Sequence, residues 1–509
     1  MPTVAINHPK IMKTTKPILY LALSLIITLS SCNKKQETQQ STTTDGPYLA
    51  TGIKIGEVDQ SSAIIWARLT KNPERVSNDA PLPEVMYKVD STGELIERRG
   101  RADLEPVVMM PESHTMETIQ GATPGAPGKV RLNYKQEGTE GWITTDWVEV
   151  SATRDYTHQF EMIDLDAGLG YDLLVEAGPS EGETISAHLE GHFRTAPAIK
   201  KSVEVNFIVT TGTAYNDVDS ETGFKLYPSS IKLNPEFFVH TGDILYYDHL
   251  GKTAALARWH WDRMYSFANH VEFHRQIPSY FIKDDHDTWM NDCWPGQETR
   301  FMGEFTYEEG TRFFMEEVTM KGKTYRTFRW GKDLQIWLME GRDYRSPNPM
   351  TDGSDKTIWG KEQMGWLKQT VAESDATFKV LISPTPIVGP DRGNKKDNHA
   401  NEGFTHEGNL VRQFISEQEN MVVVCGDRHW QYVSKDGDTG ILEFSCGPGS
   451  DDHAGGWSND KRLPEHQYLN VIGGFLEGSV SRVEGNAILT FRHYSVDGEV
   501  LNEYLVSDR

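Results

Sequence analysis

Residues 280–287 read YFIKDDHD, an apolar run that ends in a cluster of carboxylates and an imidazole. Residues 237–243 (FFVHTGD) and residues 422–429 (VVVCGDRH) follow the same design. Each stretch is typical of a buried β-strand that stops at ionisable side chains. Because ligands of α/β sheets bind outside the carboxyl ends of the strands, we expect these three ends to gather Asp and His around one or two metal ions.

Length and charge narrow the class of protein. The chain has 509 residues, enough for two or three domains, and its formal net charge is −23. Affinity for nucleic-acid phosphates comes largely from Lys and Arg, so we expect no nucleic-acid-binding surface. An acidic protein that acts on an anionic substrate needs dense local positive charge, and bound metal ions supply it.

The N-terminus predicts an export signal. Lysines precede an apolar run over residues 18–29, which is too short for a membrane span, and the run ends in LSSC at Cys32. This ending resembles a bacterial lipobox, so residues 1–32 predict a lipoprotein signal peptide with Cys32 as the lipidated residue; an ordinary signal peptide is the alternative. Residues 33–46 are polar and predict a flexible tether. The protein is then expected outside the cytoplasm, lipid-anchored to a membrane, at the outer membrane or facing the periplasm.

Two regions of different texture follow the tether. Residues 47–197 contain short β-rich runs between turn signals and predict an N-terminal β-sandwich with an insertion near 75–150. In residues 198–509, apolar runs alternate with helical patterns such as those over 254–267 and 362–371. Alternating strands and helices predict an α/β domain, here with two sheets and helices outside them.

The first strand end offers two candidate metal ligands. Gly242 precedes Asp243 and lets the chain turn sharply, which places Asp243 to bridge two metal ions. Tyr246 could be a phenolate ligand of a ferric ion, with Tyr247 as the alternative. A Gly-Asp turn followed by core tyrosines is the competing structural interpretation.

The other two strand ends add acid, base and ligand candidates. Asp285 is a candidate metal ligand, and His286 is a candidate general acid whose imidazole Asp287 would orient. A solvated charge run is the usual alternative, but the flanking residues are apolar. Asp427 and His429 are two residues apart, so strand alternation points both the same way and suits one metal site.

One arginine and two loops complete the candidates. Arg342 could clamp phosphate oxygens with its forked donors, whereas pairing with Glu340 or Asp343 is the structural alternative. The loops around residues 398–399 and 451–453 also carry His and Asp. We expect both loops at the rim of the site rather than among its ligands.

Taken together, these motifs resemble the PhoD-like alkaline phosphatase/phosphodiesterase family of the calcineurin-like metallophosphatase superfamily. GDILYY, KDDHDTWMND, LQIWLMEGRDYR, WGKEQMGWL and CGDRHW stand in that family's order, within a resemblance that covers roughly residues 47–505. The resemblance implies a four-layer αββα metallophosphatase domain preceded by a β-sandwich. It also implies hydrolysis of phosphomonoesters or phosphodiesters by a metal-activated hydroxide that attacks phosphorus.

The resemblance further implies a set of ligands and metals. Two or more metal ions are expected, calcium and iron as in the family, with zinc or manganese possible. By motif, the metal ligands would be Asp243, Tyr246, Asp285, Asp427 and His429. One departure concerns the first strand, where the family usually places a Cys but residues 210–213 read TTGT. Asp217 or Asp219 is the substitute that the sequence offers, unless the metals differ.

Three functions remain open at this point. The leading one is hydrolysis of a phosphorylated small molecule or polymer. A related metallohydrolase could instead act on another ester, such as a sulfate ester, because the same metal cage suits both anions. A non-catalytic surface binding lipoprotein is the third, although the cluster of His286 among carboxylates disfavours it.

Overall fold

The computed structural model describes residues 46–97 and 103–507. The predicted signal peptide, its lipidated Cys32 and nearly all of the tether lie outside the described residues. Among the described residues, no helix is both long and apolar enough to cross a membrane. The described residues belong to one compact unit.

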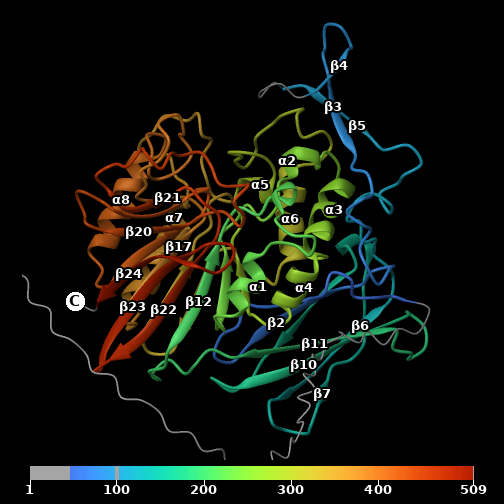
Figure 1. Cartoon of the computed structure of the whole chain (residues 1–509), viewed down its shortest axis with the longest axis horizontal. Helices are drawn as coiled ribbons and strands as arrows, with labels where there is room; N and C mark the ends of the chain where they lie inside the picture. The colour runs from blue at the N-terminus through green and yellow to red at the C-terminus, as the bar shows by residue number, and fades with distance from the viewer. Residues whose placement is uncertain (1–45, 98–102, 508–509) are drawn as a thin grey trace, which may run out of the picture. The chain divides into compact units, whose positions relative to one another are not determined.

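Two large β-sheets dominate the described residues (Figure 1). The nine-stranded sheet has the order β24-β23-β22-β12-β13-β14-β1-β2-β9, and the seven-stranded sheet has the order β15-β16-β17-β18-β20-β19-β21. The strands of the first are β1 Ile53–Gly56, β2 Ala63–Arg68, β9 Thr157–Met162, β12 Val205–Thr210, β13 Phe237–His240, β14 Ser279–Phe281, β22 Phe475–Val483, β23 Asn486–Tyr494 and β24 Val500–Ser507. Those of the second are β15 Arg326–Trp330, β16 Leu334–Leu338, β17 Phe378–Ser383, β18 Met421–Cys425, β19 Gln431–Lys435, β20 Leu442–Cys446 and β21 His466–Asn470.

The two sheets pack face to face, and helices cover their outer faces. Strand β13 shows why: Phe237 and Val239 face the core between the sheets, whereas Phe238 faces the helices. The helices are α1 Leu226–Ile231, α2 Tyr247–Leu250, α3 Ala254–Tyr265, α4 Ala268–His274, α5 Asp285–Thr288 and α6 Tyr307–Glu317 beside the first sheet, and α7 Gly360–Ala372 and α8 Thr405–Ser416 on the second. The predicted four-layer αββα arrangement and both predicted helical patterns are confirmed.

The N-terminal β-rich region is present and shares a sheet with the rest of the chain. Strand β1 pairs in parallel with β14, with Gly56 opposite Ser279, so β1, β2 and β9 extend the nine-stranded sheet. A five-stranded sheet packs on these three strands across a core that includes Ile55, Ile65 and Leu173. Its strands are β6 Lys129–Gln136, β7 Ile143–Thr144, β8 Val148–Glu149, β10 Gly170–Gly178 and β11 Ala187–Arg194. The predicted domain boundary at residue 197 stays a prediction, because one sheet crosses it.

Part of the predicted insertion forms a small sheet of its own. Strands β3 Glu84–Lys88, β4 Leu95–Ile96 and β5 Glu105–Met109 make a three-stranded sheet. Two 3-10 helices, η1 Ala152–Arg154 and η2 Tyr215–Asp217, complete the elements of the described residues.

A buried charge cluster ties the N-terminal strands to the helical layer. Arg68 of β2 lies wholly inside the protein, and its Nε is 2.8 Å from Asp155 Oδ2. A second guanidinium nitrogen of Arg68 is 3.0 Å from Oδ2 of Asp262, which belongs to α3. Removing one member of a buried ion cluster leaves uncompensated charge, which is strongly destabilising.

We therefore predict that Arg68→Ala lowers the free energy of unfolding by about 3–5 kcal/mol. Denaturant titration of the full chain measures this loss. Arg154→Ala is the matched control, because Arg154 is exposed, and a surface change of this kind is expected to stay within about 0.5 kcal/mol of wild type. Equal unfolding midpoints for the two variants would show that the cluster contributes nothing to stability.

Candidate metal centre

The turn after β13 brings two strand ends unusually close together. Gly242 has a φ of +106° and Asp243 a φ of +54°, a left-handed conformation that is uncommon for a residue with a side chain. A Cβ at position 242 would lie only 2.5 Å from the Cβ of Asp284. Glycine is therefore required here, and it lets the segment after β14 approach Asp243.

Four carboxylates and a histidine meet at these ends. Ligand atoms of Asp243, Asp285 and His286 lie within 4.8 Å of one another, and so do those of Asp243, Asp284 and Asp427. Asp243 belongs to both groups. This is the position that a carboxylate bridging two metal ions would occupy.

The oxygens of this cluster fit a cation. Asp243 Oδ1, Asp284 Oδ2 and Asp285 Oδ1 are buried, and none has a hydrogen-bond partner among the described residues. A buried polar atom without a partner is costly, so native proteins rarely leave several in one place. Carboxylate oxygens and imidazole nitrogens are the donors that divalent and ferric ions prefer. The residues present therefore fit bound metal ions.

The crowding of negative charge in this cluster also indicates that it would bind metal ions. Burial raises the pKa of Asp284 well above its ordinary value, and the charges of Asp285 and Asp243 add to the shift. Burial alone would also raise the pKa of Asp285, but Arg342 and His286 outweigh it and hold that pKa below its ordinary value. The carboxylates thus repel one another, and added positive charge would relieve this repulsion.

Asp287 has a different role from the predicted one. Its Oδ1 accepts a hydrogen bond of 2.6 Å from the backbone N–H of Asp284, and its Oδ2 accepts one of 3.1 Å from that of Ile244. Asp287 therefore fastens the two strand ends together. The prediction that it orients the imidazole of His286 is wrong.

His286 instead contacts a carboxylate from α2. Its Nδ1 is 3.0 Å from Asp248 Oδ1. Burial alone would lower the pKa of His286, but Asp248 and Asp285 outweigh it and raise the pKa to about 10. The imidazole therefore holds its proton at neutral pH, as a general acid must. Its catalytic role stays a prediction.

Arg342 is occupied inside the protein and does not face a substrate. Its side chain is wholly buried, and its Nε is 2.6 Å from Asp284 Oδ1. A second nitrogen of the guanidinium lies 3.6 Å from Asp285 Oδ1. Because these donors hold two candidate metal ligands, the predicted role of Arg342 as a phosphate clamp is wrong.

Tyr246 and His429 face Asp243 from the other side. The phenolic oxygen of Tyr246 is 3.4 Å from Asp243 Oδ2 and 3.4 Å from His429 Nε2, and His429 Nε2 is 3.5 Å from Asp243 Oδ2. Donors bound at ~2.1 Å around one tetrahedral ion are ~3.4 Å apart. The three predicted ligands thus have the spacing of one site. The alternative Tyr247 lies in the helical core, where Trp261 donates to its hydroxyl.

The last strand end presents Asp427 in a strained backbone. Its φ is +58°, and the wholly buried Arg428 contacts its carboxylate. Arg428 also lies 2.9 Å from Asp391. Arg392 directly follows Asp391 in the chain and is half-buried. Its Nε has no hydrogen-bond partner among the described residues and is 3.7 Å from Asp391 Oδ1. Arg392 therefore lies beside the Asp391–Arg428 pair and is only weakly committed to a carboxylate.

Two residues of the centre escaped the sequence interpretation. Asp284 is not among the predicted ligands, although two adjacent acids at a strand end were a signal for it. His453, expected at the rim, has its Nε2 2.6 Å from the Tyr246 oxygen. Asp217 reaches the centre only through His453, whose Nδ1 is 2.6 Å from Asp217 Oδ2.

The other loop expected at the rim is also not there. Asn398 and His399 are both buried. Nε2 of His399 is 2.9 Å from Oε2 of Glu407 in α8, so this histidine has a structural partner outside the centre. Asp219, the second candidate to replace a Cys ligand, accepts the backbone N–H of Lys225 at 2.8 Å.

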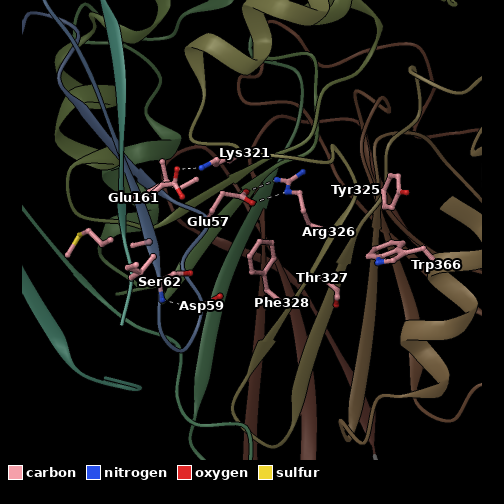
Figure 2. A pocket seen from close by; sticks show the side chains of 14 residues that line it. Glu57, Asp59, Ser62, Glu161, Lys321, Tyr325, Arg326, Thr327, Phe328 and Trp366 are labelled. Atoms are coloured by element: carbon pink, nitrogen blue, oxygen red, sulfur yellow. Dashed lines mark hydrogen bonds and ion pairs between the residues drawn. The ribbon is translucent and has the colours of Figure 1, made fainter. Parts of the chain in front are cut away.

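A separate pocket of about 380 Å³ contains none of the predicted site residues (Figure 2). It lies between the β1–β2 and β9 segments on one side and β15 with Trp366 on the other. Its charged side chains pair with each other: Arg326 lies 2.8 Å from Glu57, and Lys321 contacts Glu161. This pocket therefore contributes nothing to the metal centre.

Comparisons with solved structures support the same fold. A structure of PhoD matches 92% of this chain and 90% of its own, with a TM-score of 0.66 at 16% sequence identity. The purple acid phosphatase PPD1 from yellow lupin (Lupinus luteus) seeds matches 91% of this chain and 75% of its own, with a TM-score of 0.60 at 11% identity. At these identities the likeness shows the fold alone. No curated protein sequence matches the chain.

A sequence family provides the assignment. The model of the PhoD-like phosphatase family matches residues 207–470, which is more than half of the chain and includes every strand end described above. The protein therefore belongs to the PhoD-like phosphatase family.

Proposed function

We propose that the protein is a metal-dependent hydrolase of phosphomonoesters and phosphodiesters. Its substrates would be phosphorylated small molecules or polymers. The observation that carries this proposal is the position of Asp243 in two overlapping groups of ligands, with buried carboxylate oxygens that lack partners among the described residues. Membership of a phosphatase family supports the choice of a phosphate ester.

Two metal sites would share Asp243. One would add Tyr246 and His429, whose donor atoms lie 3.4 and 3.5 Å from Asp243 Oδ2. The other would draw on Asp284 and Asp427, whose ligand atoms lie within 4.8 Å of each other and of Asp243, with Asp285 beside them in the group that Asp243 forms with His286. When bound, the metal ions would supply Lewis-acid charge and lower the pKa of water. The resemblance favours calcium and iron, and zinc or manganese would also suit these donors.

The chain's own residues would bind the substrate anion and hold a proton. Arg392 is the side chain that we assign to the phosphate oxygens, because its side chain is 30% exposed and its guanidinium is only weakly paired. His286 Nε2 would carry the proton for the leaving oxygen, since Nδ1 faces Asp248.

Location is proposed on the sequence pattern alone. The LSSC ending at Cys32 supports a lipid anchor, and the polar residues 33–46 would space the folded unit from the membrane. The proposed enzyme would then meet substrates outside the cytoplasm.

The metal requirement is tested by removal and replacement. Chelation should abolish turnover of a chromogenic phosphoester, and iron with calcium, zinc or manganese should restore it. Asp243→Asn should lower kcat/KM by about 100-fold or more, since the metal charge accounts for several kcal/mol of transition-state stabilisation. Elemental mass spectrometry of each variant reports the metal content.

Matched controls make this test specific. Asp452→Asn makes the same chemical change at an exposed position and should leave metal content and turnover unchanged. The assay includes a phosphomonoester, a phosphodiester and a sulfate ester. Full activity after chelation, or in Asp243→Asn, would refute the proposed function. Turnover of the sulfate ester alone would show that the enzyme is a sulfatase rather than a phosphatase.

Arg392 is expected to affect substrate binding more than chemistry. Arg392→Gln should raise KM by about 10- to 100-fold, because one charge-assisted hydrogen bond contributes about 1.5–3 kcal/mol. Metal content should not change. Steady-state kinetics of Lys396→Gln, which removes an exposed cation of the same loop, provide the comparison. Equal KM values for Arg392→Gln and wild type would remove Arg392 from the substrate site.

A further inference from the structure

Two histidine side chains lie at the end of β12, where a ligand from the first strand would otherwise project. The strand ends at Thr210, and Gly212 follows with a φ of +55°. A Cβ at position 212 would lie 3.1 Å from His453 Cδ2 and 3.3 Å from His429 Cδ2. Two imidazoles therefore fill the space beside this glycine.

His453 links two residues that are far apart in the sequence. Its Nε2 is 2.6 Å from the phenolic oxygen of Tyr246, and its Nδ1 is 2.6 Å from Oδ2 of Asp217, the last residue of η2. The side chain of His453 is mostly buried, and its ring packs against that of His429 with the centroids 4.1 Å apart. The imidazole is thus held from several sides.

The chemistry of the three groups fixes the direction of the hydrogen bonds. The hydrogen bond from His453 lowers the pKa of Asp217, and an ionised carboxylate can only accept. Nδ1 of His453 then carries the hydrogen, so Nε2 accepts from the Tyr246 hydroxyl and is the acceptor for that proton when the oxygen becomes a phenolate. The other lone pairs of the Tyr246 oxygen point away from His453, so they are free to bind a metal ion beside Asp243.

We propose that His453, oriented by Asp217, is a positioning residue that holds the Tyr246 oxygen in the metal centre in place of a ligand from the first strand. The inference rests on the assignment of Tyr246 as a metal ligand in the proposed function. Direct ligation by His453 fits less well, because 2.6 Å is a hydrogen-bond distance and is shorter than the ~3.4 Å between donors around one tetrahedral ion.

A double-mutant cycle with metal binding as the readout tests this proposal. Metal-free wild type, His453→Ala, Tyr246→Phe and the double variant are each titrated with ferric iron, zinc and manganese. His453→Ala should weaken metal affinity by about 10- to 100-fold, the usual cost of losing an outer partner of a ligand. In the Tyr246→Phe background the same change should cost nothing further, because the two residues act as one unit.

Iron-loaded protein gives a second readout that does not depend on turnover. A phenolate bound to ferric iron absorbs visible light, so this band should weaken in His453→Ala, and Asp217→Asn should weaken it less. His453→Gln should restore part of the band, because its amide N–H can donate to the phenolate oxygen of Tyr246. Asp452→Asn, next to His453 in the same loop, should leave both readouts unchanged, and circular dichroism checks the fold of every variant.

Several results would overturn the inference. Unchanged metal affinity in His453→Ala would do so, and an equal loss in both backgrounds would show that His453 acts independently of Tyr246. A wild type that binds none of the three metals would refute this inference and the proposed function together. A wild type that binds metal through Tyr246 but hydrolyses no phosphoester would refute the proposed function alone.

Discussion

The buried ion pair between Arg342 and Asp284 is the interaction on which the centre depends. Without it, the carboxylate of Asp284 would lie in a water-poor interior beside Asp243 and Asp285 with no cation in contact with it. Lys283, one residue before Asp284, balances two other carboxylates: its Nζ is 2.7 Å from Glu340 and 2.7 Å from Asp343. These fixed cations balance only part of the negative charge, and the remainder is available to metal ions.

Local patterns in the sequence were sufficient to predict the layers and the strand ends. A short apolar run rich in β-branched residues and followed by a glycine, such as residues 422–425, favours a buried strand, and the polar residues that follow then lie at its end. Parallel pairing of β12, β13 and β14 then brings their ends together, as expected. This is why the sequence could place Asp243 and Asp285 together at one candidate centre, which His429 joins from the end of β18 in the second sheet.

Side-chain partners could not be predicted in the same way, because they depend on packing between distant segments. Arg342 lies in a segment 58 residues from Asp284, and its burial follows from the layer that covers it. His453 is 207 residues from Tyr246 and sits in a loop whose composition suggests only a polar surface. The roles predicted for Arg342 and Asp287 failed for this reason: their neighbours in sequence are not their neighbours in space.

The pairing of Gly56 with Ser279 makes the N-terminal region and the rest of the chain depend on each other. Ser279 begins β14, the strand that leads to Asp284, so the N-terminal region supplies the neighbour of a strand that carries the centre. Separating the chain at residue 197 would leave β14 as an open sheet edge beside the carboxylates, and such edges invite pairing with other chains. Exchanging the N-terminal region for an unrelated one would therefore change the edge on which a strand of the centre rests, however distinct the two sequences look.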